Sequence, residues 1–235
     1  MAERPIFVPA PESAELVKEL PMQIVWNPGF ASAQKKKNIM ALHAAAAKAG
    51  YSPLLEISTK SDEAVGRHLS AFNLKVHHDR LGSMPLEAAY QGSKVFERGG
   101  PYTDLYIVKD VRDAKRDARL KASGPLKGFN FADLWFPLEP KTAFYDWLYI
   151  TSLYDHREWL RTHIFHYAGF TDIEFNPERS INCQARSCAL LIALIKNESL
   201  DEAVSSPEAF IRLLSSRAYQ PQLARHTSQE TISKH

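Results

Sequence analysis

The chain has 235 residues, of which 45% are hydrophobic and 24% are charged, and its formal net charge is +2. This length fits one large domain or one domain with an appended element, and the composition is that of an ordinary globular protein with a sizeable core. The near-neutral charge gives no bulk electrostatic argument for a nucleic-acid-binding protein, although it leaves room for a local basic patch.

The cysteine content and the length of the apolar runs indicate the cellular compartment to expect. Cys183 and Cys188 stand in a CxxxxC spacing, with no second pair to complete a zinc site. We expect both to be small core residues on one helix, in a reducing cytosol. The N-terminus, MAERPIFVPAPES, lacks a basic segment followed by an apolar run, so no signal peptide is expected. Because no uninterrupted apolar stretch approaches ~18 residues, we expect no membrane span and a cytoplasmic protein.

The N-terminal quarter of the chain predicts a β-α-β unit after an irregular arm. Residues 1–21 are rich in proline, and we expect them to form an arm with a short helix near SAELVKEL. MQIVW is then typical of a strand and NPG of its turn. The alanine-rich run ASAQKKKNIMALHAAAAKAG predicts a helix closed by Gly50, and LLEIS predicts a second strand. This unit spans roughly residues 22–58.

The middle of the chain predicts short elements around one amphipathic helix. SDEAVGRHL predicts a short helix, FNLKVHH a strand and DRLGS a turn. After Pro85 we expect a helix that extends through Lys94, and the GGP sequence at 99–101 then stops it. VRDAKRDARLKA predicts one basic helix.

The C-terminal half carries most of the core. Two core helices are expected around residues 141–154 and 156–168, followed by DIEFNP as a strand or extended segment. The run CALLIALI is apolar on all sides and predicts a buried, central helix near Ser187. The polar tail from about residue 216 is expected to be mobile. Together these elements predict a helix-dominated α+β fold.

Four polar residues fall on one face of the helix predicted after Pro85. Glu87, Tyr90, Gln91 and Lys94 are spaced i, i+3, i+4 and i+7. This row is either an exposed amphipathic face or the wall of a ligand site. Glu87 and Lys94 are two turns apart, roughly 10 Å along the axis, so they do not form the usual surface pair. The small residues and glycines on either side favour a shaped pocket.

A second polar cluster lies in FTDIEFNPERSINCQARS. Polar residues alternate there with Phe and Ile at Asp172, Glu174, Asn176, Asn182 and Gln184. A strand would place the first three on one face. That face is either an edge facing water or a site wall that binds sugar hydroxyls.

The histidines and the short motifs give no sign of a metal or a cofactor. His77 and His78 are adjacent, so on a strand they point to opposite faces. His163 and His166 lack a matching acidic helix motif. The sequence contains no Walker loop, GxSxG or GxGxxG motif. We therefore expect neither a metal nor a cofactor.

The stretch that ends at Lys94 resembles the NADAR domain family, the NAD- and ADP-ribose-associated domains that include riboflavin-intermediate N-glycosidases. That family shows a pattern similar to LSNF, an extended segment, a glycine turn and E-x-x-x-Q-x-x-K. Here it stands as LSAFNL at 69–74, RLGS at 80–83, and Glu87, Gln91 and Lys94. HREWLRTHIFHYAGFTDIEF and INCQARSCALLIALI are similar to later parts of the family, so the resemblance covers about residues 66–196.

Two features depart from the family pattern. Its Trp-Gly loop before the final helix is replaced by NPERS, and the β-α-β unit is an addition. The expected fold is a NADAR-like helical core with an N-terminal β-α-β addition. We expect an arm and extension at 1–65, a catalytic core at 66–215 and a tail at 216–235.

The resemblance implies cleavage of an N-glycosidic bond between ADP-ribose or ribose phosphate and a base or amine. It implies that Lys94 is the nucleophile, since a desolvated amine has a lowered pKa, and that Glu87 is the acid/base. The substrate contacts implied are Ser70 and Asn73 for ribose, Lys115 and Arg119 for phosphate, Gln91 as an orienting amide, and Phe72, Tyr90, Glu174 and Asn182.

Two other functions stay open at this point. One is a non-catalytic module that binds ADP-ribose or a nucleotide, and the other is an ADP-ribosyltransferase that consumes NAD. The leaving group is a base of modified DNA or RNA, part of a free metabolite, or a protein side chain. An ADP-ribosyltransferase toxin as genetic partner would indicate reversal of a base modification.

Overall fold

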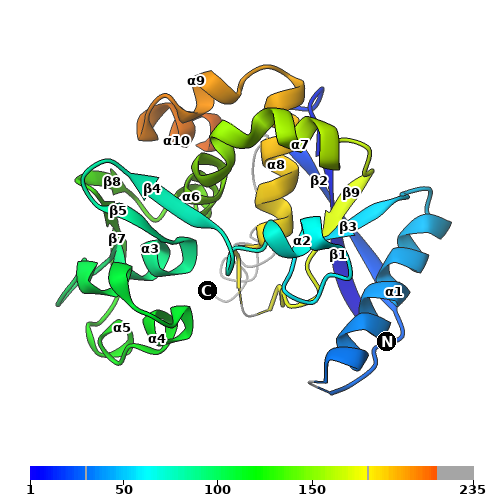
Figure 1. The fold of residues 1–235 in the computed structure, drawn as a ribbon, viewed down its shortest axis with the longest axis horizontal. Helices are drawn as coiled ribbons and strands as arrows, with labels where there is room; N and C mark the ends of the chain where they lie inside the picture. Colours follow the sequence, from blue (N-terminus) through cyan, green and yellow to red (C-terminus); the bar gives the residue numbers. More distant parts are fainter. Residues whose placement is uncertain (30, 179, 216–235) are drawn as a thin grey trace, which may run out of the picture.

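A four-stranded mixed sheet with a helix on each face forms one side of the molecule (Figure 1). The computed structural model describes residues 1–29, 31–178 and 180–215, and the tail predicted to be mobile lies outside them. The strands are β1 (Ala2–Ala10), β2 (Leu16–Ile24), β3 (Leu54–Glu56) and β9 (Gly169–Thr171), in the order β2-β1-β9-β3. Helix α1 (Ser32–Lys48) covers one face, and α8 (Gln184–Lys196) covers the other.

The first two strands form a hairpin, so the prediction of an irregular arm with a short helix was wrong. The prolines that suggested an arm are compatible with a hairpin. Pro5 lies opposite Pro21, and alternate opposed pairs in an antiparallel ladder exchange no hydrogen bonds. Both faces of β1 are covered, because Ile6 packs on the α1 side and Phe7 on the α8 side. This two-sided burial stabilises the strand.

The predicted helix and strand after the hairpin are confirmed as α1 and β3. Gly50 closes α1 with a φ of +88°, which a side chain disfavours. β2 and β3 run parallel, but β1 and β9 lie between them. The sheet therefore joins the N-terminal strands to residues 169–171, and the division of the chain at residue 65 stays a prediction.

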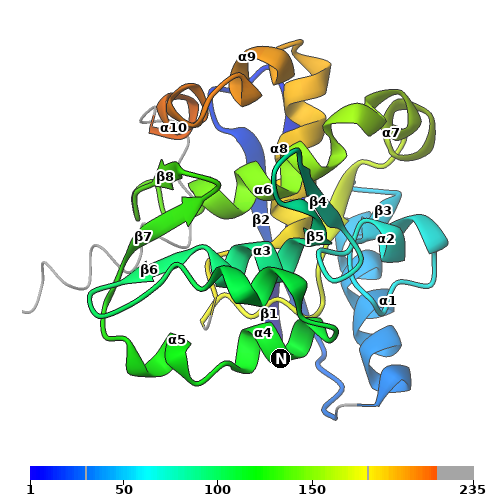
Figure 2. The same cartoon turned by 60° about the vertical axis from the view of Figure 1, so that its left-hand side comes forward.

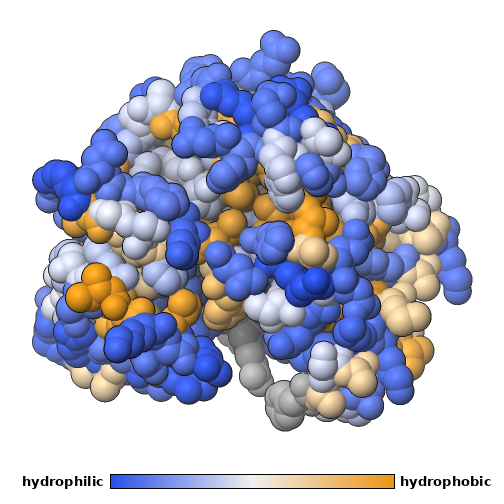
Figure 3. All heavy atoms as spheres, in the orientation of Figure 1, coloured by the Kyte–Doolittle hydropathy of each residue, from blue (hydrophilic) through white to orange (hydrophobic). Residues whose placement is uncertain are grey.

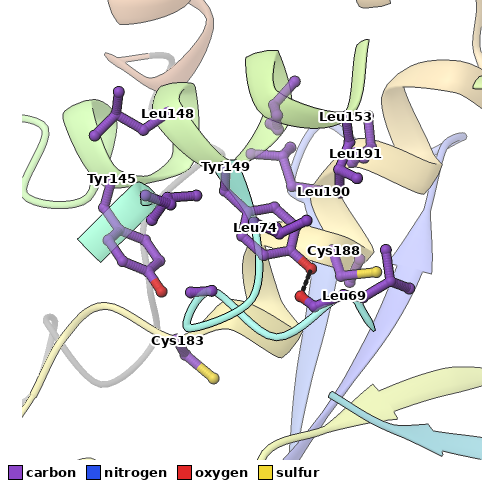
Figure 4. Packing of buried hydrophobic residues seen from close by; sticks show 14 of the residues in the cluster. Leu69, Leu74, Tyr145, Leu148, Tyr149, Leu153, Cys183, Cys188, Leu190 and Leu191 are labelled. Carbon is purple, nitrogen blue, oxygen red and sulfur yellow. Dashed lines mark hydrogen bonds between the residues drawn. The ribbon is translucent and has the colours of Figure 1, made fainter. Parts of the chain in front are cut away.

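Helices α6 (Ala143–Leu153) and α8 form the centre of the core, with α3 (Leu86–Gly92) packed against α6. Residues 184–195 of α8 are all buried, so the predicted central helix is confirmed. Figure 4 shows Tyr149 of α6 among the leucines of this core, where its hydroxyl donates to the Leu69 carbonyl at 2.8 Å.

The two cysteines lie in this core as free, buried thiols, as the sequence predicts. Cys183 precedes α8 and Cys188 lies on it. Within the described ranges, none of the helices is both long and apolar enough to cross a membrane.

A second region lies on the side of α6 that is away from the four-stranded sheet (Figure 1 and Figure 2). Here β4 (Lys75–His78) and β5 (Gly82–Pro85) form a hairpin that leads into α3, and β6 (Lys94–Phe96), β7 (Leu126–Phe131) and β8 (Leu134–Phe136) form an antiparallel sheet. The shorter helices are α2 (Ala64–His68), η1 (Thr103–Ile107), α4 (Val111–Arg116), α5 (Arg119–Ala122), η2 (Tyr154–His156), α7 (Arg157–Ile164), α9 (Leu200–Val204) and α10 (Pro207–Ser215).

Two local predictions differ from the structure. The predicted basic helix is two short helices, α4 and α5, separated at Asp117, whose carboxylate accepts a hydrogen bond from the Arg119 backbone N–H at 2.9 Å. Such an aspartate favours a new helix start over continuation of the old one. The strand or extended segment predicted at DIEFNP, residues 172–177, contains no strand, because β9 ends just before it at Thr171 and the chain then turns.

Arg186 of α8 holds two carboxylates in the core. Its Nε donates to Glu19 Oε1 at 2.6 Å and its Nη1 donates to Asp146 Oδ2 at 3.2 Å, and all three side chains are buried. We expect Arg186→Met to lower the free energy of unfolding by about 3–5 kcal/mol, because two buried carboxylates lose their cation. Urea denaturation measures this loss. The control is Arg157→Met, which removes a surface pair with Asp201 and should leave the urea midpoint nearly unchanged. An equally small loss for Arg186→Met would contradict this account.

Candidate active site

A pocket of about 1070 Å³ opens between α3 and the segments at 59–60, 71–72 and 172–184. The dense polar groups of the Glu87 helix, the LSAFN segment and the DIEFNPERSIN segment predict a ligand pocket between these three segments, and residues of all three line this cavity. Residues 59–60 and 109–115 form further walls. In Figure 3 the lower outline of the molecule is notched between the lobe that carries α3 to α5 and the lobe that carries α1 and α2.

Lys94 lies on β6 and not on α3, so the prediction of one helix from Glu87 to Lys94 was wrong. The chain leaves the helix because Lys94 pairs with Phe129 of β7. Gly100 lies against this turn with a φ of +81°, and a Cβ at that position would lie 2.1 Å from the Lys94 carbonyl oxygen. The position of Lys94 thus depends on the sheet and on a glycine.

The polar side chains of α3 and β6 still form one row. Lys94 Nζ donates to Gln91 Oε1 at 2.7 Å, and Gln91 Nε2 donates to Glu87 Oε1 at 2.7 Å. Glu87 and Gln91 are buried and Lys94 is partly buried. An amide therefore links the amine to the carboxylate in place of a direct ion pair.

The pKa of the Lys94 amine is lowered. Burial is the main cause, because it disfavours the ammonium form; the Glu87 carboxylate opposes this shift, and the positive charge of Lys115 assists it. A lowered pKa increases the fraction of neutral amine at a given pH, and only the neutral amine is a nucleophile.

Tyr90 joins this row to the opposite wall of the pocket. Lys94 Nζ lies 4.9 Å from the centroid of the Tyr90 ring, within reach of a cation–π contact. The Tyr90 hydroxyl accepts a hydrogen bond from Asn182 Nδ2 at 2.7 Å. Burial raises the pKa of this hydroxyl, so Tyr90 stays protonated.

Cationic side chains gather where residues 109–115 line the pocket, at Lys109, Arg112 and Lys115. Asp110 orients Arg112, whose Nη2 donates to Asp110 Oδ2 at 2.8 Å. Lys115 Nζ lies 5.9 Å from the centroid of the Phe72 ring, which is 37% exposed. This side of the pocket therefore combines positive charge with an aromatic face, a combination suited to a phosphate and a base.

Two residues expected to contact ribose, Ser70 and Asn73, lie outside the pocket lining. Ser70 is buried, and its hydroxyl donates to Gln184 Oε1 at 3.2 Å. Asn73 Nδ2 donates to the Arg67 carbonyl at 2.7 Å. Both side chains are therefore engaged in holding the loop between α2 and β4.

Arg119, expected to contact phosphate, also lies outside the lining. It donates to Asp104 Oδ2 at 2.6 Å and to Asp117 Oδ2 at 2.9 Å. One continuous helix would have placed Arg119 and Lys115 on the same face, and the break at Asp117 removes that alignment. The predicted residues that line the pocket are Phe72, Glu87, Tyr90, Gln91, Lys94, Lys115, Glu174 and Asn182.

The pocket also contains residues to which the sequence assigned no specific role, among them Asp172, Gln184 and Tyr145. Gln184 Oε1 accepts a hydrogen bond from the Ala71 N–H at 2.8 Å, which fixes the 71–72 loop against the start of α8. The alternation of polar and apolar residues pointed to Asp172 and Gln184. Tyr145 lies in an aromatic run that gave no signal to separate it from core residues. Among the described residues, no three His, Cys, Asp or Glu side chains are grouped to hold a metal ion.

Comparison with protein families matches residues 2–223 to the family described as DarT1-associated NADAR antitoxin. The chain belongs to this family. The match starts at residue 2, so this NADAR family includes the strands of the N-terminal sheet as well as residues 66–196, which carry the resemblance seen in the sequence. Comparison with curated proteins found no match.

We expect opposite shifts of the Lys94 pKa in two variants. Glu87→Gln removes the negative charge that raises this pKa, so the pKa should fall further. Lys115→Gln removes a positive charge that lowers it, so the pKa should rise. Nuclear magnetic resonance titration of isotope-labelled dimethyl-lysine measures both shifts, with the exposed Lys48 as an internal reference. Shifts of the same sign would show that these two charges do not act on Lys94.

Proposed function

We propose that this NADAR protein is an N-glycosidase that cleaves the bond between C1 of the terminal ribose of ADP-ribose and a modified nucleic-acid base. The observation that carries the proposal is the row of Lys94, Gln91 and Glu87, in which a partly buried amine lies near a buried carboxylate. The volume of the pocket, about 1070 Å³, lies near the upper end of the range for ligand sites and suits a ligand as large as ADP-ribose.

The family description supports a biological setting for this reaction. It names a DarT1-associated antitoxin, and we propose that the protein reverses base modification by an ADP-ribosyltransferase toxin. The substrate is then modified DNA or RNA in the cytoplasm, and no metal or cofactor is required. A free ribosyl metabolite is the competing substrate.

The proposed chemistry follows from the row on α3 and β6. The neutral amine of Lys94 attacks C1 of the ribose while the bond from C1 to the base nitrogen breaks. Glu87 takes up the proton that the amine loses. Gln91 orients both groups in the free protein and keeps the amine out of a direct ion pair, which would raise its pKa. Water then hydrolyses the ribosyl-lysine and releases ADP-ribose.

The proposed orientation of the substrate places its diphosphate against the cationic wall. Lys109, Arg112 and Lys115 line that wall, and Lys115 is close enough to Lys94 to lower its pKa. A diphosphate beside Lys115 would therefore bring the terminal ribose toward the Lys94 amine. The exposed face of Phe72 offers a surface on which adenine can stack.

We expect Lys94→Ala to abolish release of ADP-ribose from an ADP-ribosylated oligonucleotide. Its affinity for free ADP-ribose should stay within about tenfold, or ~1.4 kcal/mol, of the wild type, because phosphate and ribose contacts provide most of the binding. Liquid chromatography measures turnover and calorimetry measures affinity. The ribosyl-lysine can open its ribose ring to an imine, which borohydride reduces to a stable amine. Borohydride added during turnover should therefore attach an ADP-ribosyl group to the wild type and none to Lys94→Ala.

The matched control is Lys121→Ala, which removes an exposed lysine of α5 and should behave as the wild type. An active Lys94→Ala enzyme would end the covalent mechanism and leave Glu87 acting on water. A wild type that binds ADP-ribose tightly but releases none from the oligonucleotide would instead support the non-catalytic binding module.

The cationic wall gives a further prediction. Arg112→Ala should weaken ADP-ribose binding by roughly tenfold or more, since a guanidinium forms charge-assisted and often bidentate hydrogen bonds to phosphate. Arg119→Ala should change the affinity by less than about threefold, because Arg119 is bound to Asp104 and Asp117 outside the pocket. Calorimetric titration with ADP-ribose compares the two. A larger effect of Arg119→Ala would restore the phosphate contact predicted from the sequence.

A further inference from the structure

The proposed displacement involves two proton transfers. The attacking amine loses a proton, and the departing base nitrogen gains one. Glu87 is an acceptor while it is ionised, so it cannot also be the donor in that step. The pocket should therefore contain a second titratable group that carries a proton.

Asp172 is a carboxyl group on the wall formed by the 172–184 segment, away from α3 in the sequence. It is partly exposed, and it lines the same pocket as Lys94 and Glu87. Its Oδ1 accepts a hydrogen bond from the Glu174 backbone N–H at 3.0 Å. Tyr145 of α6 also lines this pocket. Burial raises the pKa of its hydroxyl, and the charges of Glu87 on one wall and Asp172 on the other raise it further.

A second carboxyl group behind this wall favours a proton on Asp172. Glu56 of β3 is buried and accepts three hydrogen bonds, from Ser58 Oγ at 2.6 Å, Thr171 Oγ1 at 2.6 Å and the Ile173 N–H at 2.8 Å. Burial raises the pKa of Glu56, and the three donors oppose this shift by stabilising its ionised form. Two neighbouring carboxyl groups resist a double negative charge, and because the pKa of Asp172 is raised well above its usual range, we assign the proton to Asp172.

The electrostatics of the wall agree with this geometry. Burial raises the pKa of the Asp172 carboxyl well above its usual range, and the charges of Glu56 and Glu174 raise it further. The hydrogen bonds from the Glu174 backbone N–H and the Gln184 side chain oppose this shift without reversing it. The other titratable groups that face it are Tyr145 from α6 and Cys183 at the start of α8, and burial raises the pKa of both. No group in this set supplies a positive charge.

We propose that Asp172 is the acid that protonates the leaving base, and that Asp172 and Glu87 divide the acid and base roles between the two walls. This assignment rests on the proposed N-glycosidase function. It resembles other enzymes in which two carboxyl groups take opposite roles because their surroundings differ.

The atoms and charges balance in the first step. The lone pair of the Lys94 amine forms the bond to C1, and the C1–N bond electrons stay on the base nitrogen. The carboxyl proton of Asp172 passes to the base, and a proton of the amine passes to Glu87. The products are the free base, a ribosyl-lysine, an ionised Asp172 and a protonated Glu87.

Hydrolysis then restores both groups. Water adds its oxygen to C1, and Asp172 takes a proton from that water. The electrons of the bond between C1 and Lys94 return to the amine nitrogen, which takes the proton held by Glu87. ADP-ribose leaves, and every group has regained its starting protonation state.

The pH dependence of kcat/KM tests this assignment on an ADP-ribosylated oligonucleotide. In the wild type kcat/KM should fall at high pH as Asp172 loses its proton. Asp172→Asn should lower kcat/KM by roughly 10²–10⁴-fold and lack this alkaline limb, while Asp172→Glu should recover part of the rate. Asp155→Asn, which removes an exposed carboxylate before α7, is the control and should match the wild type.

A second variant keeps the test valid if Asp172→Asn fails to fold. Glu174→Gln removes one of the charges that raise the Asp172 pKa, so it should move the alkaline limb to lower pH. In the contrary outcome, the wild type releases base while Asp172→Asn keeps both the alkaline limb and a kcat/KM within about threefold of the wild type. That result would show that Asp172 is not the acid, and it would leave the proposed N-glycosidase function intact. If the wild type releases no base, the proposed function itself is wrong.

Discussion

A buried guanidinium, that of Arg186, joins three parts of the chain. It binds Glu19 from the N-terminal hairpin and Asp146 from α6, and it belongs to α8 between them. Such a charge is stable in a core only when its partners are fixed. Two residues earlier on the same helix, Gln184 binds the Ala71 N–H on the pocket wall. The orientation of α8 that satisfies Arg186 therefore also places one wall of the pocket.

On the other wall, formed by α3 and β6, the charges of Lys94 and Glu87 are kept apart. A direct ion pair between Lys94 and Glu87 would favour the ammonium and oppose nucleophilic attack. Gln91 fills the space between them with an amide that donates to one group and accepts from the other. Lys115 adds a positive charge nearby, and that charge lowers the pKa of the amine. The wall thus keeps a proton acceptor near the amine while burial lowers the pKa of the amine.

The sequence predicted the polar residues that line the pocket better than the helices and strands that hold them. Glu87, Gln91 and Lys94 stand in an ordered motif, so a resemblance could find them without the correct secondary structure. Helical periodicity alone placed Lys94 on α3, because i+7 spacing carries no information about a helix that ends at Gly92. Lys94 is held by its strand pairing with Phe129, which lies 35 positions later (129 − 94) in the sequence, and no local pattern reports such a pairing.

Other differences between the predicted and the observed structure also have identifiable physical causes. The prolines at 5 and 21 suggested an arm, yet they face each other in a hairpin, where neither has to donate to the other. Asp117 accepts a hydrogen bond that divides one predicted helix into two, and this removes Arg119 from the pocket. The raised pKa of Asp172 comes mainly from burial and is increased by the charge of Glu56, which lies far away in the sequence. Burial and charge at a distance in sequence therefore set the properties that periodicity cannot predict.

In the proposed complex, one cavity holds the diphosphate on α4 and presents the ribose C1 to Lys94. A crystal structure with bound ADP-ribose would show whether the substrate adopts this orientation. We predict the diphosphate beside Arg112 and Lys115, with the terminal ribose carbon within about 3.5 Å of Lys94 Nζ, as attack requires. ADP-ribose bound elsewhere, or in the cavity with this carbon turned away from Lys94, would contradict the account.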